Sequence, residues 1–522
     1  MTAEGLKPGS RLFKSGTPMT TQSDASAETA AQPAAAQPVT SEPQAAPAKP
    51  ASHDTTPPPA LLDFMMKRWK PSSQKLPPKL KHADAFRARR RALSKLFPGE
   101  TLVVPTGHEK VRANDTHYRF RPGTDFYYLT GNTEPDCVLV LQPKEGGGHT
   151  DILFVEPNPG RSDATFFTDR VKGELWVGPR LGVKESQARY AVDEARGLPE
   201  LKDYLSGLHG AVSRPTRVLR GMSGKVDDVL PAQAERDKTL AQALSELRLL
   251  KDAQEIRELQ AAIDSTQRGF EDVIAGLKGA KTERTVEGIF GLRARVEGND
   301  VGYGTIAAAG SHACVLHWTR NDGPVKKGEL LLLDAGVEGN SLYTADITRT
   351  LPISGKFSKE QKEIYELVLD AQEQAIAAVK PGNDFMEPNR VAMHVLAKGL
   401  ERLGILPDAE EALKDEHQFY KRYSLHNVSH MLGLDVHDCA QARQEAYKYG
   451  KLQPGMVLTV EPGLYFQTDD LTVPARYRGI GVRIEDDVVV TARGCKVLSG
   501  AIPRQAKDVE AWMKRVWAKA KK

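Results

Sequence analysis

Strand-like apolar runs in the second half of the chain end in acidic residues, and this pattern restricts the possible folds more than any other feature. Asp334 ends the run LLLLD, Glu461 ends MVLTVE and Glu485 ends VRIE. A buried carboxylate needs a metal or another cation beside it, because burial otherwise keeps it protonated. A single acid at a strand end usually reaches solvent. Several in one segment predict that the strand ends converge on a shared cation-binding site.

A β-hairpin is predicted for LLLLDAGVEGNSLYTADITRT, where two strand-like runs flank a turn signal at residues 338–340. Asp334 and Asp346 lie six residues on either side of Asn340. Hairpin symmetry would make them cross-strand neighbours, with Cβ atoms about 5 Å apart. Facing carboxylates repel each other unless a cation lies between them, although a hairpin with two solvated acids is the alternative.

Three of the chain's 13 histidines, His426, His430 and His437, lie within twelve residues in SLHNVSHMLGLDVHD. Their apolar neighbours make His430 a candidate neutral imidazole ligand, although a lone histidine in such surroundings is more often a core residue. Four carboxylates and one imidazole form an oxygen-rich donor set, which favours Mn²⁺ or Mg²⁺ over a closed structural zinc site. Two such ions about 3.5–4 Å apart would activate one water molecule, so we expect a hydrolase.

Composition excludes several other classes of function. A formal net charge of +4 over 522 residues is too small to give the positive electrostatic potential of a nucleic-acid-binding protein. No apolar run reaches the length that a membrane-spanning helix needs. The N-terminus lacks the apolar segment of a secretory signal. The four cysteines form no CxxC pair and suit a reducing compartment. We therefore expect a cytoplasmic protein that binds neither nucleic acid nor membrane.

The chain divides into four predicted segments. Residues 1–60 are rich in Ala and Pro and are expected to be a disordered extension. Residues 61–247 alternate helical stretches with the strand-like runs TLVVPTG, DFYYLTG, CVLVLQP and DILFVEP, as an α/β domain would. Residues 248–505 mix both kinds of element, including a helix with Ser358 as N-cap, and residues 506–522 form a basic C-terminal helix.

Five motifs in order resemble those of the pita-bread metallopeptidases, and most closely those of the aminopeptidase P (Xaa-Pro aminopeptidase) family. They are DAGVEG with ADITRT, HNVSHMLGLDVHD, LTVEPGLY and GIGVRIEDD, preceded by an N-terminal stretch, NDTHYRFRPGTDFYYLTG, similar to the creatinase-like domain of that family. The resemblance implies an α+β fold: a C-terminal pita-bread catalytic domain preceded by an α/β creatinase-like N-terminal domain.

The resemblance also implies a role for each matching residue. Two divalent metal ions, with Mn²⁺ favoured, would be held by Asp334 on one side and by His430 and Glu461 on the other, with Asp346 and Glu485 bridging. Glu461 would also orient the attacking water and handle its proton. His317 and His437 would contact the reacting peptide, and Arg483 with Tyr465 would hold Asp334. The implied substrate contacts are His426, Tyr303, Tyr465, Asp115 and, from a neighbouring subunit, Trp176.

The implied reaction is hydrolysis of the bond between an N-terminal residue and a following proline. Peptides with proline in the second position are the expected partners, and the role of Trp176 implies a homo-oligomer, either a dimer or a tetramer. Prolidase, which cleaves Xaa-Pro dipeptides with the same metal ligands, is the alternative enzyme. A protein of the same fold that binds other proteins without catalysis is a further alternative. Such a protein would be recognised by the loss of metal-ligand residues.

Overall fold

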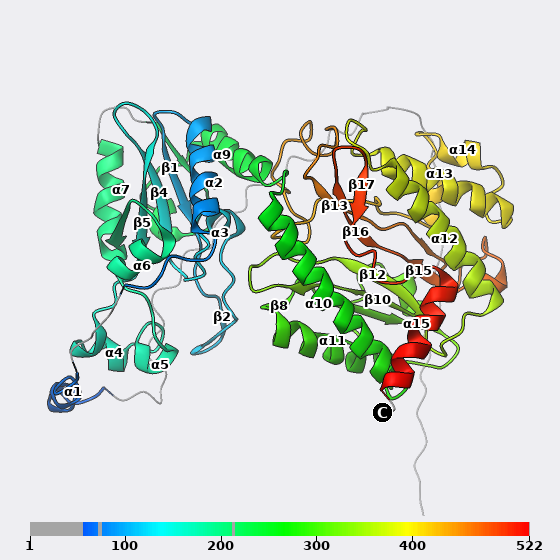
Figure 1. The fold of residues 1–522 in the computed structure, drawn as a ribbon, viewed down its shortest axis with the longest axis horizontal. Coiled ribbons are helices and arrows are strands. Elements are labelled where there is room, and N and C mark those ends of the chain that lie inside the picture. Colours follow the sequence, from blue (N-terminus) through cyan, green and yellow to red (C-terminus); the bar gives the residue numbers. More distant parts are fainter. Residues whose placement is uncertain (1–55, 71–75, 211–214, 521–522) are drawn as a thin grey trace, which may run out of the picture. The chain divides into compact units, whose positions relative to one another are not determined.

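The computed structural model of the chain describes residues 56–70, 76–210 and 215–520 (Figure 1). Most of the extension expected over residues 1–60 lies outside the described residues. Among the helices of the described ranges, none combines the length and the apolar character needed to cross a membrane. The first helix described is α1 (Pro59–Met65).

A five-stranded sheet with the order β6-β5-β4-β1-β7 organises the first half of the chain. β4 pairs antiparallel with β1 and β5, whereas the outer pairs β5–β6 and β1–β7 are parallel. The elements of this half are β1 (Thr101–Pro105), β2 (Val111–Ala113), β3 (Thr116–His117), α3 (Thr124–Thr130), β4 (Val138–Pro143), β5 (His149–Val155), α4 (Thr165–Thr168), α5 (Glu174–Val177), α6 (Val183–Tyr190), β6 (Glu194–Gly197) and β7 (Thr216–Val218).

Helices cover both faces of this sheet, which explains its apolar strands. Leu102 of β1 points into a core shared with α2 (Ala83–Leu96) and α9 (Ala234–Leu247). Val103 points the other way, into a core with α7 (Leu201–Gly210) and α8 (Gly224–Asp227). Successive residues of a strand face opposite sides of the sheet, so both faces need apolar side chains.

The predicted strand DFYYLTG is wrong: this segment is helix α3. The helix is enclosed on all sides, with every residue from Phe126 to Thr130 buried, so no helical period of polar residues is visible in the sequence. Gly131 ends the helix in the left-handed conformation, with φ of 67°. Burial therefore overrides the strand preference of the aromatic residues.

The second half contains several small sheets and long helices. Its sheets have the orders β12-β10-β9 and β13-β16-β17, with two-stranded pairs β14-β15 and β11-β8. The strands are β8 (Asp300–Val301), β9 (Ile306–Ala309), β10 (Leu330–Ala335), β11 (Val337–Glu338), β12 (Ile347–Pro352), β13 (Val457–Val460), β14 (Gly463–Tyr465), β15 (Gly481–Arg483), β16 (Asp486–Val490) and β17 (Cys495–Val497). The helices are α10 (Ala253–Leu277), α11 (Glu283–Glu297), α12 (Lys359–Ala378), α13 (Glu387–Arg402), α14 (Ala409–Leu413) and α15 (Ala506–Lys519).

The long helices begin where their capping residues predict. Ser358 caps α12 in a reciprocal capping box with Gln361, as the sequence indicates, and Asp252 caps α10 with Glu255 in the same way. Helices α10 and α11 lie together in Figure 1, with Phe270 and Phe290 in edge-to-face contact between them. The C-terminal helix α15 packs against α10, since the indole of Trp517 donates a 2.6 Å hydrogen bond to the carbonyl of Ile274.

The hairpin of β10 and β12 forms, but its centre lies one residue later than predicted, so each cross-strand partner is shifted by two residues. Asp334 lies opposite Thr348 rather than opposite Asp346. The turn closes through the Leu342 amide, which donates to the carbonyl of Gly339, with Leu342 itself at a φ of 61°. Asp346 is therefore a diagonal neighbour of Asp334, which still leaves the two side chains at the same end of the sheet.

Candidate metal centre and active site

One cavity of about 580 Å³ collects the side chains that end the strands of the second half. Asp334 lies near the end of β10, Asp346 directly before β12 and Glu461 directly after β13, while Glu485 lies between β15 and β16. His430 comes from the loop before β13. The predicted residues that line this cavity are Asp334, Asp346, His430, Glu461, Glu485, His317, His426, His437, Tyr303 and Arg483.

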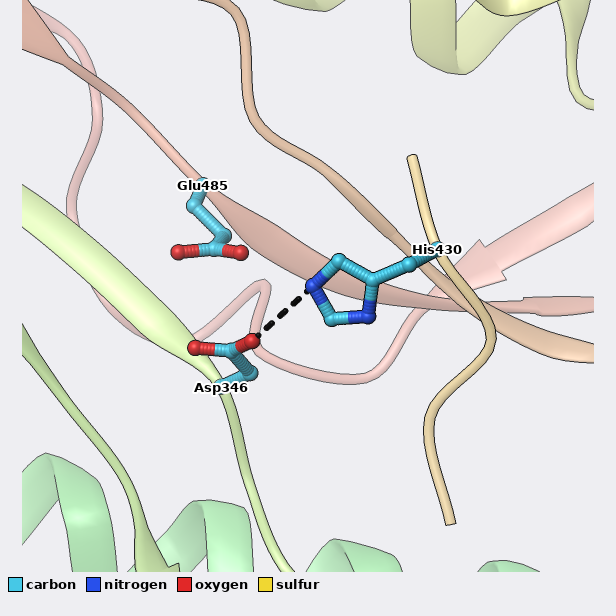
Figure 2. Close-up of side chains that lie close together, drawn as sticks. All are labelled: Asp346, His430 and Glu485. Atoms are coloured by element: carbon cyan, nitrogen blue, oxygen red, sulfur yellow. Dashed lines mark ion pairs between the residues drawn. The ribbon is translucent and has the colours of Figure 1, made fainter. Parts of the chain in front are cut away.

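Three of the predicted ligands converge closely in Figure 2. One ligand atom each of Asp346, His430 and Glu485 lies within 4.8 Å of the other two. The Nε2 atom of His430 is 3.2 Å from Oδ2 of Asp346 and 3.4 Å from Oε1 of Glu461. Carboxylate oxygens and an imidazole nitrogen at such spacings can share a divalent cation.

The electrostatics of the cluster favour a bound cation. Burial, together with the charges of Asp346 and Glu461, raises the pKa of Glu485 well above its usual range. Burial likewise raises the pKa of Glu461 to about 7. Burial alone would lower the pKa of His430, but its hydrogen bond with Asp346 and the charge of Glu461 outweigh this effect and raise it to about 9. The donor set thus fits divalent metal, which would ionise the acids and leave His430 as a neutral ligand.

Asp334 is held by a chain of hydrogen bonds in the wall of the cavity. Its Oδ2 accepts from the guanidinium of Arg483 at 2.6 Å and its Oδ1 from the hydroxyl of Tyr303 at 2.6 Å. Arg483 also donates to the hydroxyl of Tyr465 at 2.9 Å, and that hydroxyl lies 2.7 Å from Nε2 of His426. This chain links a metal-ligand candidate to the side chains predicted to contact substrate, and it fixes both.

The remaining two histidines face the cavity without joining the cluster. His437 packs edge-on against His430, with ring centroids 4.4 Å apart, and His317 lies in the segment that joins β9 to β10. Burial and the charges of Arg483 and other groups lower the pKa of His426 to about 4, so this imidazole is neutral near pH 7.

Asp115 and Trp176 are not among the residues that line this cavity. Both are on the first half of the chain and both are exposed. They are linked through Arg170, whose guanidinium is 3.4 Å from Asp115 and lies over the ring of Trp176 at 4.7 Å. The structure therefore groups these two residues with each other, and their predicted contact with substrate stays a prediction.

Three further residues support the cluster and were not assigned from the sequence. The hydroxyl of Thr348 donates to Glu485 at 2.6 Å, and the hydroxyl of Thr459 lies 3.5 Å from Oε1 of Glu461. The carboxylate of Asp487 accepts from the Asp346 amide at 3.2 Å. Each of these residues is two positions from a ligand candidate, so strand alternation was the signal that could have identified them.

Two family models match the chain. That of metallopeptidase family M24 covers residues 257–492, and that of the aminopeptidase P N-terminal domain covers residues 86–216. The fold and the cluster of acids and histidine agree with these matches. Together they define a metallopeptidase of the M24 class, and therefore a hydrolase.

Individual relatives identify the family within the M24 class to which the chain belongs. Xaa-Pro aminopeptidase 1 of Streptomyces coelicolor is 53% identical over 430 residues, which cover 82% of this chain and 86% of the relative. The structure of Pseudomonas aeruginosa aminopeptidase PepP is 33% identical with a TM-score of 0.75, covering 84% of this chain and 99% of that one. Escherichia coli aminopeptidase P with the inhibitor Pro-Leu is 31% identical with a TM-score of 0.74 over the same shares. The chain belongs to the aminopeptidase P family, and the predicted α+β fold class is confirmed.

Proposed function

We propose that this enzyme removes the N-terminal residue from peptides whose second residue is proline. The observation that carries the proposal is the cavity in which four acids from strand ends and loops meet four histidines. The name of the Streptomyces relative and the proline-containing inhibitor of the Escherichia coli neighbour support this substrate class. A cavity of this volume is within the range of sites that bind small peptides.

The proposed cofactor is a pair of divalent metal ions, with Mn²⁺ favoured by the oxygen-rich donors. Asp334 would hold one ion, His430 and Glu461 the other, and Asp346 with Glu485 would bridge them. When bound, such a pair lowers the pKa of a shared water molecule and stabilises negative charge on a carbonyl oxygen. The close approach of Asp346, His430 and Glu485 supports this arrangement.

Glu461 is the proposed group that holds and moves the proton of the attacking water. Its Oε2 lies 3.6 Å from Nδ1 of His426 and its Oε1 lies 3.4 Å from Nε2 of His430. His426 is therefore the nearby imidazole that could exchange a proton with this carboxylate, because Nε2 of His430 is a proposed metal ligand. His317 and His437 face the same space and are the proposed N–H donors to the scissile peptide group.

The proposed domain boundary lies between α9 and α10. The first helix ends at Leu247 and the second begins at Ala253, and the two matched family models lie on either side of this break. This boundary gives a first domain of residues 61–247 and a catalytic domain of residues 248–505. The proposed extension covers residues 1–60 and the proposed helical tail covers residues 506–522. Four free cysteines support a reducing, cytoplasmic location.

Parallel assays test the proposed reaction. Enzyme reconstituted with Mn²⁺ should cleave both Xaa-Pro dipeptides and longer Xaa-Pro-Yaa peptides, and peptides with alanine in place of proline serve as the control. Cleavage of dipeptides alone would identify a prolidase instead. Equal cleavage of the alanine controls would contradict the proline requirement.

A further inference from the structure

A fully buried glutamate outside the cavity organises one of its walls. Glu283 is the first residue of α11, and its carboxylate accepts four hydrogen bonds. Oε1 accepts from the amide of Ala309 and from Nδ1 of His312, each at 2.8 Å. Oε2 accepts from the indole of Trp318 at 2.8 Å and from the amide of Gly323 at 2.7 Å. Because a carboxylate offers about four lone-pair sites, all of them are in use.

Three of the four donors belong to the segment that joins β9 to β10, and the fourth, Ala309, is the last residue of β9. Ala309 and His312 precede His317, whereas Trp318 and Gly323 follow it. The two arms of the segment also touch each other, because the ring of His312 stacks on the ring of Trp318 with centroids 3.9 Å apart. Glu283 therefore ties both arms together, and His317 lies between the two tied points.

Helix capping does not account for this carboxylate. The N-terminus of α11 is already capped by Thr282, whose hydroxyl accepts from the amide of Thr285. An acid in the first turn of a helix often serves the helix dipole alone. Here each oxygen is instead bound to one arm of the segment, and Leu316 and His317, which lie between those arms, line the cavity.

We infer that Glu283 is a positioning residue, which fixes His317 in the place from which it contacts the reacting peptide. The inference rests on the proposed role of His317. Catalysis depends steeply on such placement, since an error of about 1 Å can cost on the order of 10²-fold in rate. Glu283 itself touches neither the cavity nor the metal-ligand candidates.

The variant Glu283→Gln isolates this role without changing the shape of the side chain. An amide has one acceptor oxygen and one donor group, so in either orientation it can serve only one of the two arms. The other arm loses both of its hydrogen bonds, and His317 loses its fixed position. Glu287→Gln, one turn further along α11 and outside the four contacts, is the matched control.

A double-mutant cycle with His317→Ala distinguishes positioning from general damage. Glu283→Gln should lower kcat between about 10-fold and 10²-fold, leaving metal content and KM similar. In the His317→Ala background, Glu283→Gln should change kcat less than about twofold, because the group it positions is gone. Trp318→Phe removes one of the four donors and should lower kcat by a smaller factor, again only when His317 is present. This variant replaces Glu283→Gln if Glu283→Gln fails to fold. Melting temperatures show which variants fold.

The possible results distinguish a failure of the inference about Glu283 from a failure of the proposed role of His317. If Glu283→Gln costs the same factor in both backgrounds, or costs nothing in the parent enzyme, the inference is wrong while the proposed function stands. If His317→Ala retains full activity, the proposed role of His317 fails, and the inference fails with it.

Discussion

Two buried aspartates in the cavity have different sources of positive charge. Asp334 accepts a hydrogen bond from the guanidinium of Arg483 at 2.6 Å, so a protein cation accompanies it. Asp346 lies among carboxylates, and its nearest cationic partner is His430 at 3.2 Å. Burial raises the pKa of Asp346 accordingly. Asp346 therefore depends more than Asp334 on a bound metal ion.

This difference predicts the consequence of neutralising Asp346. The variant Asp346→Asn should lose bound metal, rather than only activity, because the proposed bridging oxygens contribute to both ions. Elemental analysis after gel filtration measures the metal content per chain. Asp370→Asn, on the exposed face of α12, is the control and should retain its metal. Full metal content with full activity in Asp346→Asn would contradict the bridging role.

His437 should behave differently, since it faces the cavity without belonging to the cluster. As the proposed donor to the developing oxyanion it would matter in the transition state, and removing one such donor typically costs about 10²–10³ in turnover. His437→Ala should therefore keep its metal and a similar KM while kcat falls by about that factor. His394→Ala, an exposed histidine of α13, should match the parent enzyme. Unchanged kcat with a lower melting temperature would instead identify His437 as a packing residue.

The loop that carries His437 is anchored to the junction between α9 and α10. Asp438 accepts from Nε of Arg248 at 3.0 Å and from Nζ of Lys251 at 3.1 Å, and all three side chains are buried. Gly433 permits this packing, because a Cβ atom there would collide with the Asp438 carboxylate. Burial alone would raise the pKa of Asp438, but the charges of Lys251 and Arg248 outweigh it and lower the pKa to about 2.

A pH-dependent stability follows from this anchor. The unfolded-state pKa of an aspartate is about 3.9, so the stabilisation is fully present above about pH 4 and is lost as pH falls through about 2. Asp438→Asn leaves the buried Lys251 without its carboxylate partner, whereas Arg248 keeps its ion pair with Asp125, and the variant should lower the free energy of unfolding by about 3–5 kcal/mol at pH 7. Urea unfolding at several pH values should show this difference shrinking below pH 4. A difference that is constant from pH 7 to pH 2 would refute the ion-pair explanation, and exposed Asp415→Asn is the control.

For the whole protein, the position of Trp176 matters most. Its neighbours in α5, Leu175 and Val177, are also exposed, at 56% and 49%. A short helix with three adjacent exposed apolar residues suits a contact with another subunit. None of these three residues lines the described cavity of the same chain, so the proposed contribution of Trp176 to catalysis is to the cavity of a neighbouring chain.

We accordingly expect a dimer or a tetramer in solution, measured by light scattering at assay concentration. Trp176→Ser should lower activity towards peptides, because the side chain would no longer complete the neighbouring cavity. Tyr449→Ser, another exposed aromatic residue, should have little effect. A fully active monomer would rule out the proposed role of Trp176.

Local patterns predicted most of the secondary structure and the acids of the candidate site, whereas Tyr303 and His317 were predicted from the motif resemblance. Apolar runs that end in Asp334, Glu461 and Glu485 are strands with those acids at or just beyond their ends, because alternation and burial act over a few neighbouring residues. The N-cap at Ser358 is equally local. Motif resemblance then predicted the family and the α+β fold class.

Other features depended on contacts between distant segments. The helix α3 is set by its burial on all sides, and the hairpin register by the turn that Leu342 adopts, so neither could be read from local propensity. Glu283 and Asp438 are ordinary acids in the sequence. Their importance comes from donors up to 40 and 190 residues away, respectively. Such pairings leave no periodic trace along the chain, because only the packed fold brings those donors within hydrogen-bonding distance.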